Sequence, residues 1–345
     1  MTDLCFASLH SGGLMTNYVC NSSCAHCLYR SSPRREKGYI SEDVARAVFR
    51  RVRSLGCRSM HIGGGEPFLD AGGLKRVLRI ADEEGMGIDY VETNCGWFRD
   101  ASGTDDLLRE LIQLGCGTLL LSIDPFHNAH IPFGKVKEVM AACSRTNMNV
   151  FPWRMEFFDE IDALDDTIAH GLDEYEARYG AGYLRTLLER YGVTPGGRAL
   201  ETLAPFLSEM SWEEALDGAP RRCADFTNTS HFHVDMHGHY IPARCVGMFV
   251  RMEDLGAPLD PAVYPTLTTL HGGGLRSLLE RARTEADFTP GDTYRSHCEL
   301  CTDIRRHVAT TAPEVLPDLG PCEFYTVDAV RLDACGSAPA PADTE

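Results

Sequence analysis

The sequence predicts an α/β protein, with a partial (β/α)6 TIM-like barrel followed by a small C-terminal domain made of a β-hairpin and a helix. Between residues 13 and 158, short apolar or β-branched runs alternate with amphipathic stretches, as in βα units around a parallel sheet. Polar and glycine-rich residues follow these runs, at the strand ends where such barrels assemble their chemistry. From residue 221 the pattern changes to a hairpin with frequent cysteines.

The predicted strands and helices alternate along the barrel. Strands are expected at 14–19, 59–62, 88–93, 118–123 and 149–157, and a sixth somewhere between 160 and 220. Helical patterns, with apolar residues three and four apart, cover 42–54, 73–84, 104–114 and 135–146. Ser41 is the predicted N-cap of the first helix, with Glu42 and Asp43 in its first turn.

The boundaries follow from changes in composition. We expect residues 1–220 to form the barrel, although the place of the acidic, helical segment 159–220 on it stays open. Within that segment Thr194-Pro195-Gly196-Gly197 is a break. Residues 221–325 form the small domain, whose hairpin at 232–241 turns at His237-Gly238. We expect residues 326–345 to form a tail that is disordered at its end, because it is rich in Ala, Pro and Asp.

Composition excludes several classes of function. Fifty acidic and 33 basic side chains give a net charge of −17, which repels nucleic acid and anionic membranes. No window approaches the roughly 18 consecutive apolar residues of a membrane helix, and no secretory signal precedes residue 14, so a cytoplasmic protein is expected. In that reducing compartment, 14 cysteines favour metal ligation over disulfides.

Three cysteines follow the first predicted strand directly. Cys20, Cys24 and Cys27 lie in a short polar loop, where three thiolates can converge on one iron-sulfur cluster. Three ligands leave one iron free to bind the amino and carboxylate groups of S-adenosylmethionine (SAM) and to deliver an electron to it. A structural zinc site, with His26 as the fourth ligand, is the alternative.

The cysteine spacing C-x3-C-x2-C resembles the motif of the radical SAM superfamily. A second element, Gly63-Gly64-Gly65-Glu66-Pro67, is similar to the superfamily's glycine-rich motif, which zinc would not explain. The resemblance implies that Gly64, Gly65, Glu66 and Pro67 hold the methionine amino group of SAM. It also implies that the residue before the last cysteine, an imidazole at His26 where relatives usually have an aromatic ring, lies near the adenine.

Further SAM contacts are expected from the resemblance at the ends of later strands. They are Thr93, Asn94, Ser122, Asp124 and Arg154, and the alternative for each is an ordinary strand-end cap or a surface residue. Asp124 and His127 lie at the expected mouth of the barrel and are candidate catalytic acids, bases or substrate anchors. A helix cap by Asp124 is the alternative.

A second set of cysteines lies in the C-terminal region. Cys223, Cys245, Cys298 and Cys301 offer four thiolates, and their arrangement resembles the twitch extension, a shortened SPASM domain that carries an auxiliary 4Fe-4S cluster. Six residues separate Gly238 from Cys245, where the full SPASM pattern has four, which argues against two auxiliary clusters. Cys322 and Cys335 are possible substitutes, and a four-cysteine zinc site is the alternative.

The resemblance implies a radical SAM oxidoreductase or maturase with SAM and two 4Fe-4S clusters as cofactors. It would form a 5′-deoxyadenosyl radical, abstract a hydrogen atom, and oxidise or cross-link a peptide in natural-product maturation. The alternatives are a dehydrogenase of an aminocyclitol or sugar, a glycyl-radical activase, and a zinc-stabilised binding module without redox chemistry. An external donor such as flavodoxin or ferredoxin would supply electrons. Because the first motif cysteine is residue 20, we expect a separate protein to deliver any peptide.

Overall fold

The computed structural model describes residues 3–327, which form one eight-stranded sheet, a two-stranded ribbon and the helices packed around them. The order of strands in the large sheet is β5-β4-β3-β2-β1-β7-β8-β9. The strands are β1 (Ser11–Met15), β2 (Ser59–Gly63), β3 (Gly87–Thr93), β4 (Thr118–Ser122), β5 (Asn149–Trp153), β7 (His231–Val234), β8 (His239–Ile241) and β9 (Val250–Arg251). The ribbon pairs β6 (Met210–Ser211) with β10 (Thr293–Tyr294).

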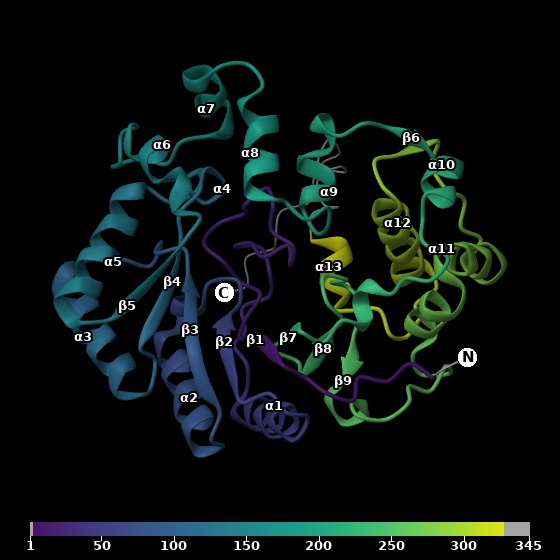
Figure 1. The fold of residues 1–345 in the computed structure, drawn as a ribbon, viewed down its shortest axis with the longest axis horizontal. Coiled ribbons are helices and arrows are strands. Elements are labelled where there is room, and N and C mark those ends of the chain that lie inside the picture. The colour runs from purple at the N-terminus through teal and green to yellow at the C-terminus, as the bar shows by residue number, and fades with distance from the viewer. Residues whose placement is uncertain (1–2, 328–345) are drawn as a thin grey trace, which may run out of the picture.

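Six strands of the sheet are parallel, which confirms the α/β class and the open barrel. β1 to β5 follow in chain order, each paired with the next, and β7 lies on the other side of β1 (Figure 1). β8 and β9 continue the sheet in antiparallel fashion.

The sixth parallel strand is not where the sequence placed it. We expected it between 160 and 220, but the only strand there is the two-residue β6, which pairs with β10 outside the barrel. The prediction was wrong because segment 159–220 is acidic and folds into short helices. The sixth parallel strand is instead β7, the first strand of the hairpin, which pairs with the edge of β1 that β2 leaves open.

The four predicted helices of the βα units are present. They are α1 (Glu42–Ser54), α2 (Ala71–Glu83), α3 (Ala101–Gln113) and α5 (Phe133–Thr146). The Ser41 hydroxyl accepts a hydrogen bond from the Val44 amide at 3.3 Å, which confirms the predicted N-cap. Each of these helices buries its apolar face in the common core, as the three- and four-residue spacing predicted.

Short helices follow β4 and β5 and make up most of segment 159–220. These are α4 (Pro125–Asn128), α6 (Phe158–Asp162), α7 (Leu172–Tyr179), α8 (Tyr183–Tyr191), α9 (Ala199–Thr202) and α10 (Trp212–Asp217). The predicted break at 194–197 separates α8 from α9. Short 3-10 turns lie at Pro67–Asp70 (η1), Met155–Phe157 (η2), Ala204–Phe206 (η3), Asp225–Thr227 (η4) and Met252–Asp254 (η5).

The C-terminal region packs two long helices beside the hairpin. The helices are α11 (Pro265–Ala286), α12 (His297–Thr311) and the short α13 (Cys322–Thr326), and Figure 1 shows them on the side of the molecule opposite α3 and α5. The hairpin of β7 and β8 turns at Gly238, as predicted, with a φ of 78°. Most of the predicted tail, and Cys335 with it, lies outside the described residues.

The first strand is displaced from its predicted position. We expected 14–19, but β1 spans Ser11–Met15 because two glycines, Gly12 and Gly13, belong to it. Their lack of side chains makes room for Phe232 and His61, whose rings lie where Cβ atoms would be. Among the described residues, no helix is both long and apolar enough to span a bilayer.

Candidate active site

A cavity of about 440 Å³ opens at the carboxyl ends of the parallel strands and brings the three N-terminal cysteines together. Residues from all five βα units line it, one group after each strand: Met15, Gly64, Gly65, Thr93, Asn94, Ser122, Trp153 and Arg154. Cys20, Cys24 and Cys27 line the same cavity. The loop therefore brings the three cysteines of the motif to one cavity, as the sequence analysis expected.

The cysteine loop is held by polar contacts to its sulfur atoms and main chain. The Ser22 hydroxyl lies 3.2 Å from Sγ of Cys20 and 3.4 Å from Sγ of Cys24. The Asn94 amide donates to Sγ of Cys20 at 3.4 Å. The buried guanidinium of Arg198 donates to the Cys24 carbonyl at 2.9 Å. Ser22 and Arg198 were not predicted, although Ser22 lies inside the motif.

The donor set fits a metal cluster. Burial raises the pKa of the Cys20 thiol well above its usual range, and the neighbouring Cys24 and Glu66 raise it further. Three sulfur atoms gathered in one cavity are stable together as thiolates only when positive charge is bound among them, as an iron-sulfur cluster provides.

The glycine-rich turn after β2 packs tightly against the residues before the cysteines. A Cβ atom at Gly65 would lie 2.0 Å from the carbonyl oxygen of Val19, so only glycine fits there. The Gly65 amide donates to the Asn17 carbonyl at 2.8 Å, and the Glu66 amide donates to the Val19 carbonyl at 3.0 Å. These contacts fix the turn beside the cysteine loop.

The side chain of Glu66 points into the protein rather than along the cavity wall. It is fully buried, and its carboxylate accepts hydrogen bonds from the amides of Phe68 (3.1 Å) and Asn94 (2.8 Å) and from the Thr93 hydroxyl (3.0 and 3.1 Å). Burial raises the pKa of Glu66 to about 7, although these donors oppose the shift. Glu66 thus ties the end of β2 to the end of β3, while Gly64, Gly65 and Pro67 line the cavity.

His26 lies in an aromatic group at the cavity wall. Its ring is 4.6 Å from that of Phe126 and 4.8 Å from that of Tyr191, and its Nε2 is 3.0 Å from the Tyr191 hydroxyl. Burial lowers the pKa of His26 to about 3, so the ring is neutral. Tyr191, at the end of α8, was missed because segment 159–220 could not be placed from the sequence.

Asp124 and His127 form a pair, a contact that the sequence analysis did not predict. Asp124 is buried and caps α4, with its carboxylate 3.0 Å from the His127 amide and 2.7 Å from Nδ1 of the His127 ring. Burial disfavours charge on both, but their mutual attraction holds the pKa of His127 well above its usual value and that of Asp124 below it. His127 lines the cavity, whereas Asp124 lies behind it.

Ser122 and Arg154 complete the cavity wall at the ends of β4 and β5. Arg154 follows β5, where its backbone is left-handed with a φ of 65°. Its guanidinium lies 4.9 Å from the ring centres of Trp153 and of Tyr191, and it donates to the Tyr191 carbonyl.

The second set of cysteines lines a separate cavity of about 560 Å³. Cys223, Cys245, Cys298 and Cys301 all line it. Burial raises the pKa of Cys245 to about 12, which the nearby Arg305 opposes and the other three thiols reinforce. Cys322, the possible substitute, is exposed and does not line this cavity.

Arg305 is a buried cation beside the second set. It is 5% exposed and donates to the Val246 carbonyl at 2.9 Å and to the Tyr325 hydroxyl at 3.3 Å. Burial disfavours its charge, yet Tyr325 and the thiols of Cys301 and Cys245 hold the pKa of Arg305 above its usual value. The second cavity therefore has a fixed positive charge at its wall.

The two cavities adjoin one another. Four residues line both of them: Leu28, Thr194, His231 and His233. The first set of cysteines and the second set thus line neighbouring cavities.

Comparison with known proteins identifies the N-terminal part. Residues 15–152 match the model of the radical SAM superfamily. A curated relative from Bacillus subtilis (strain 168), YydG, whose name assigns it to peptide biosynthesis, is 28% identical over 125 residues. That match covers 35% of this chain and 38% of the relative, so it spans well under half of the relative's length.

Several solved structures are similar at low identity. Native anSMEcpe with bound AdoMet is 16% identical with a TM-score of 0.43, and the match covers 72% of this chain and 79% of that one. BtrN in complex with AdoMet and 2-DOIA is 14% identical with a TM-score of 0.38, covering 80% and 91%. SuiB of Streptococcus suis bound to S-adenosylmethionine is 12% identical with a TM-score of 0.33, covering 69% and 60%.

The matched residues contain the cysteine motif, the glycine-rich turn and the ends of β3 and β4, which form most of the lining of the first cavity. The superfamily implies SAM and a 4Fe-4S cluster as cofactors. The similarity to the radical SAM superfamily is therefore established for residues 15–152, the part of the chain that holds the first set of cysteines.

Proposed function

We propose that this chain is a radical SAM enzyme that oxidises or cross-links a peptide with the help of two 4Fe-4S clusters. Cys20, Cys24 and Cys27 would hold the first cluster, and the second cavity would hold the auxiliary cluster on Cys223, Cys245, Cys298 and Cys301. The observation that carries the proposal is that two cavities, each lined by one complete cysteine set, adjoin one another. An electron left on a substrate at the junction would have a nearby acceptor.

The residues of the first cavity have distinct roles in this proposal. When bound, the cluster supplies the electron that cleaves SAM to the 5′-deoxyadenosyl radical, which takes a hydrogen atom from the substrate. Gly64, Gly65 and Pro67 offer main chain to the methionine part of SAM, with Glu66 holding the turn in place. Thr93, Asn94, Ser122 and Arg154 offer polar groups to its carboxylate and ribose.

The remaining pocket residues orient the substrate and move protons. His26, neutral and packed among aromatic rings, offers its plane to the adenine. His127 can hold or deliver a proton at the cavity wall. Asp124 is a positioning residue, because its carboxylate holds Nδ1 of His127 and so fixes the orientation of that ring.

A peptide is favoured as the substrate by two observations. The relative YydG is named for peptide biosynthesis. In addition, aromatic side chains of β3 and β5 form a row beside the cavity: Tyr90 and Trp153 line the cavity, and Phe151, which is 41% exposed, lies between them at ring distances of 5.7 and 6.0 Å. Such a row of rings suits the side chains of an extended chain. A flavodoxin or ferredoxin would deliver the electrons.

The test is to measure iron and sulfide per chain after anaerobic reconstitution, together with 5′-deoxyadenosine formed from SAM and dithionite. We expect about eight irons in the wild type and about four in a variant with Cys20, Cys24 and Cys27 changed to Ala, which forms no 5′-deoxyadenosine. A variant with the four C-terminal cysteines changed to Ala should also hold about four irons but should still cleave SAM.

Cys322→Ala is the matched control, because Cys322 is a C-terminal cysteine outside the second cavity. It should keep the iron content and SAM cleavage of the wild type. About four irons in the wild type would refute the auxiliary cluster, and 5′-deoxyadenosine from the N-terminal triple variant would refute the assignment of the first set.

A further inference from the structure

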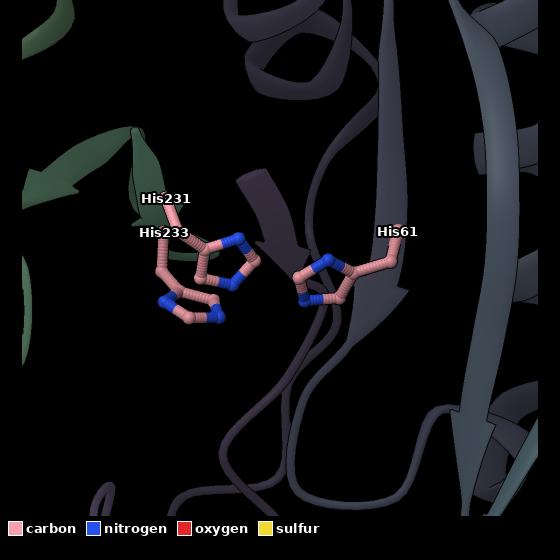
Figure 2. A group of neighbouring side chains, drawn as sticks. All are labelled: His61, His231 and His233. Atoms are coloured by element: carbon pink, nitrogen blue, oxygen red, sulfur yellow. The ribbon is translucent and has the colours of Figure 1, made fainter. Parts of the chain in front are cut away.

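Three histidines from two distant segments meet on the inner face of the sheet. His61 lies on β2, and His231 and His233 lie on β7; Figure 2 shows the three side chains pointing toward one another across β1. One ring nitrogen from each of the three lies within 4.8 Å of the other two. None of the three has a role in the proposed function.

The register of the sheet explains why they meet. Gly13 of β1 is aligned with His61 on one side and with His233 on the other, so all three residues face the same way in one cross-strand row. A Cβ atom at Gly13 would lie 2.1 Å from Nε2 of His61. The imidazole of His61 therefore occupies the space above a glycine, which brings it to the histidines of β7.

His61 has a buried ring nitrogen without a hydrogen-bond partner. The residue is 2% exposed, and among the described residues nothing donates to or accepts from its Nε2. The nearest carboxylate oxygen, Oε1 of Glu92, is 3.6 Å away, which is too far for a good hydrogen bond. Leaving a buried polar atom without a partner destabilises a protein by about 1–3 kcal/mol. A ligand bound among the three rings would give Nε2 of His61 a partner.

The other two histidines are suited to the same ligand. Nδ1 of His231 is 3.3 Å from the Ser11 hydroxyl, the kind of outer contact that orients a ligating ring. Burial lowers the pKa of His61 to about 3 and also lowers those of His231 and His233, so the rings are neutral and their lone pairs are free to bind a cation.

The ring arrangement allows a common centre. The rings of His61 and His231 are parallel with centres 5.3 Å apart, and that of His233 is nearly perpendicular to both. The torsion that turns a histidine ring is broad, so modest rotations can aim one lone pair of each ring at a single ion about 2.0–2.1 Å away.

We propose that His61, His231 and His233 bind one divalent transition-metal ion such as zinc, which keeps a fourth coordination position for an oxygen or nitrogen atom of a bound substrate. Three imidazoles with an open position form a known type of catalytic zinc site. His231 and His233 line both cysteine-lined cavities, so a substrate atom bound to this ion would lie at the junction between them. Glu92, which lines the first cavity, is the acidic group nearest to His61.

Zinc binding to the holoenzyme tests the proposal without any activity measurement. Both cysteine sets are first loaded with iron and sulfide so that thiolates do not compete. Zinc is then added by equilibrium dialysis, zinc per chain is measured, and the zinc K-edge X-ray absorption spectrum identifies the ligands. We expect one zinc per chain with a shell of nitrogen and oxygen at about 2.0–2.1 Å and no sulfur at about 2.3 Å.

Two variants and one control make the assignment specific. His61→Phe keeps an aromatic ring between Tyr90 and His231, and His231→Ala changes an exposed residue. Each of these two variants should bind zinc at least about 100-fold more weakly than the wild type. Loss of a residue that only supports a ligand weakens metal binding by about 10- to 100-fold, so a larger effect indicates loss of a ligand. His237→Ala, a histidine in the turn of the same hairpin, should bind zinc like the wild type.

Three results would overturn the proposal. They are a wild-type holoenzyme that retains no zinc, a zinc shell that contains sulfur, and unchanged zinc affinity in His231→Ala. Because the iron content is measured in the same samples, failure of this site is distinguishable from failure of the two cysteine sets.

Discussion

Gly65→Ala should damage both the fold and SAM cleavage, because the new methyl group has nowhere to go. Its carbon would lie 2.0 Å from the carbonyl oxygen of Val19, 2.5 Å from the carbonyl carbon and 2.8 Å from the Tyr18 oxygen. All three are main-chain atoms and cannot rotate away. The strand end and the cysteine loop would have to separate by about 1 Å or more to restore ordinary contact distances.

That separation would break the hydrogen bonds that join the two segments. The Gly65 amide lies 2.8 Å from its acceptor on Asn17, and the Glu66 amide 3.0 Å from its acceptor on Val19. Overpacking costs about 1–3 kcal/mol and each hydrogen bond about 0.5–1.5 kcal/mol, so the free energy of unfolding should fall by about 2–6 kcal/mol. For a chain of 345 residues this loss should lower the Tm by about 3–8 °C.

Thermal unfolding of the reconstituted protein and 5′-deoxyadenosine formation are the two measurements. Gly117→Ala is the matched control, because a Cβ atom at Gly117 meets nothing within 4 Å, and it should change the stability by no more than about 0.5 kcal/mol. If Gly65→Ala melts at the wild-type temperature and cleaves SAM at the wild-type rate, the close approach described for this turn is wrong.

Three further predictions concern single side chains. Tyr191→Phe removes the hydroxyl 3.0 Å from Nε2 of His26 and should raise KM for SAM about two- to tenfold in the 5′-deoxyadenosine assay, with an unchanged Tm; an unchanged KM would contradict the role given to His26. Arg305→Met leaves the buried acceptors of its guanidinium without a donor, so the free energy of unfolding measured in urea should fall by about 2–3 kcal/mol. An unchanged free energy of unfolding would refute this. Burial disfavours the charged form of His170, but Glu174, 2.9 Å away, and a main-chain carbonyl favour it more, so the pKa of His170 is raised overall. The charged ring therefore stabilises the fold fully below about pH 6.5, and this stabilisation is lost as the pH rises through the raised pKa. The stability advantage of wild type over His170→Gln, from urea unfolding, should be largest near pH 6 and absent near pH 9, and an equal difference at both would be inconsistent with this pair.

The parts of the fold that depend on neighbours in sequence were predicted well. Helix α1 begins and ends at the expected residues because its apolar period and the cap at Ser41 are local signals. The strand β7 was not predicted as part of the barrel, because its partner β1 precedes it by more than 200 residues. The sequence of a four-residue strand does not indicate which other strand it will pair with. The start of β1 was also missed, because Gly12 and Gly13 belong to it and glycine is rare in strands. Glycine is needed at both positions because rings from other strands occupy the space of a side chain.

The candidate site shows the same division. The spacing of Cys20, Cys24 and Cys27 brings them to one cavity because they share one short loop. Glu66 was expected to face SAM, yet its carboxylate is engaged with Thr93 and the main chain, a contact that depends on how β2 and β3 lie together. Tyr191 joins the cavity from a helix that the sequence could not place.

The position of β1 between β2 and β7 has a consequence for synthesis on the ribosome. Ser11 and His231, which lie side by side in the sheet, are 220 residues apart in the chain. At about 5–20 residues per second, roughly 10–45 s pass between the making of one edge and the making of its partner. During that interval the edge of β1 that will pair with β7 has unpaired amides and carbonyls, and an unpaired edge can pair with a strand of another chain.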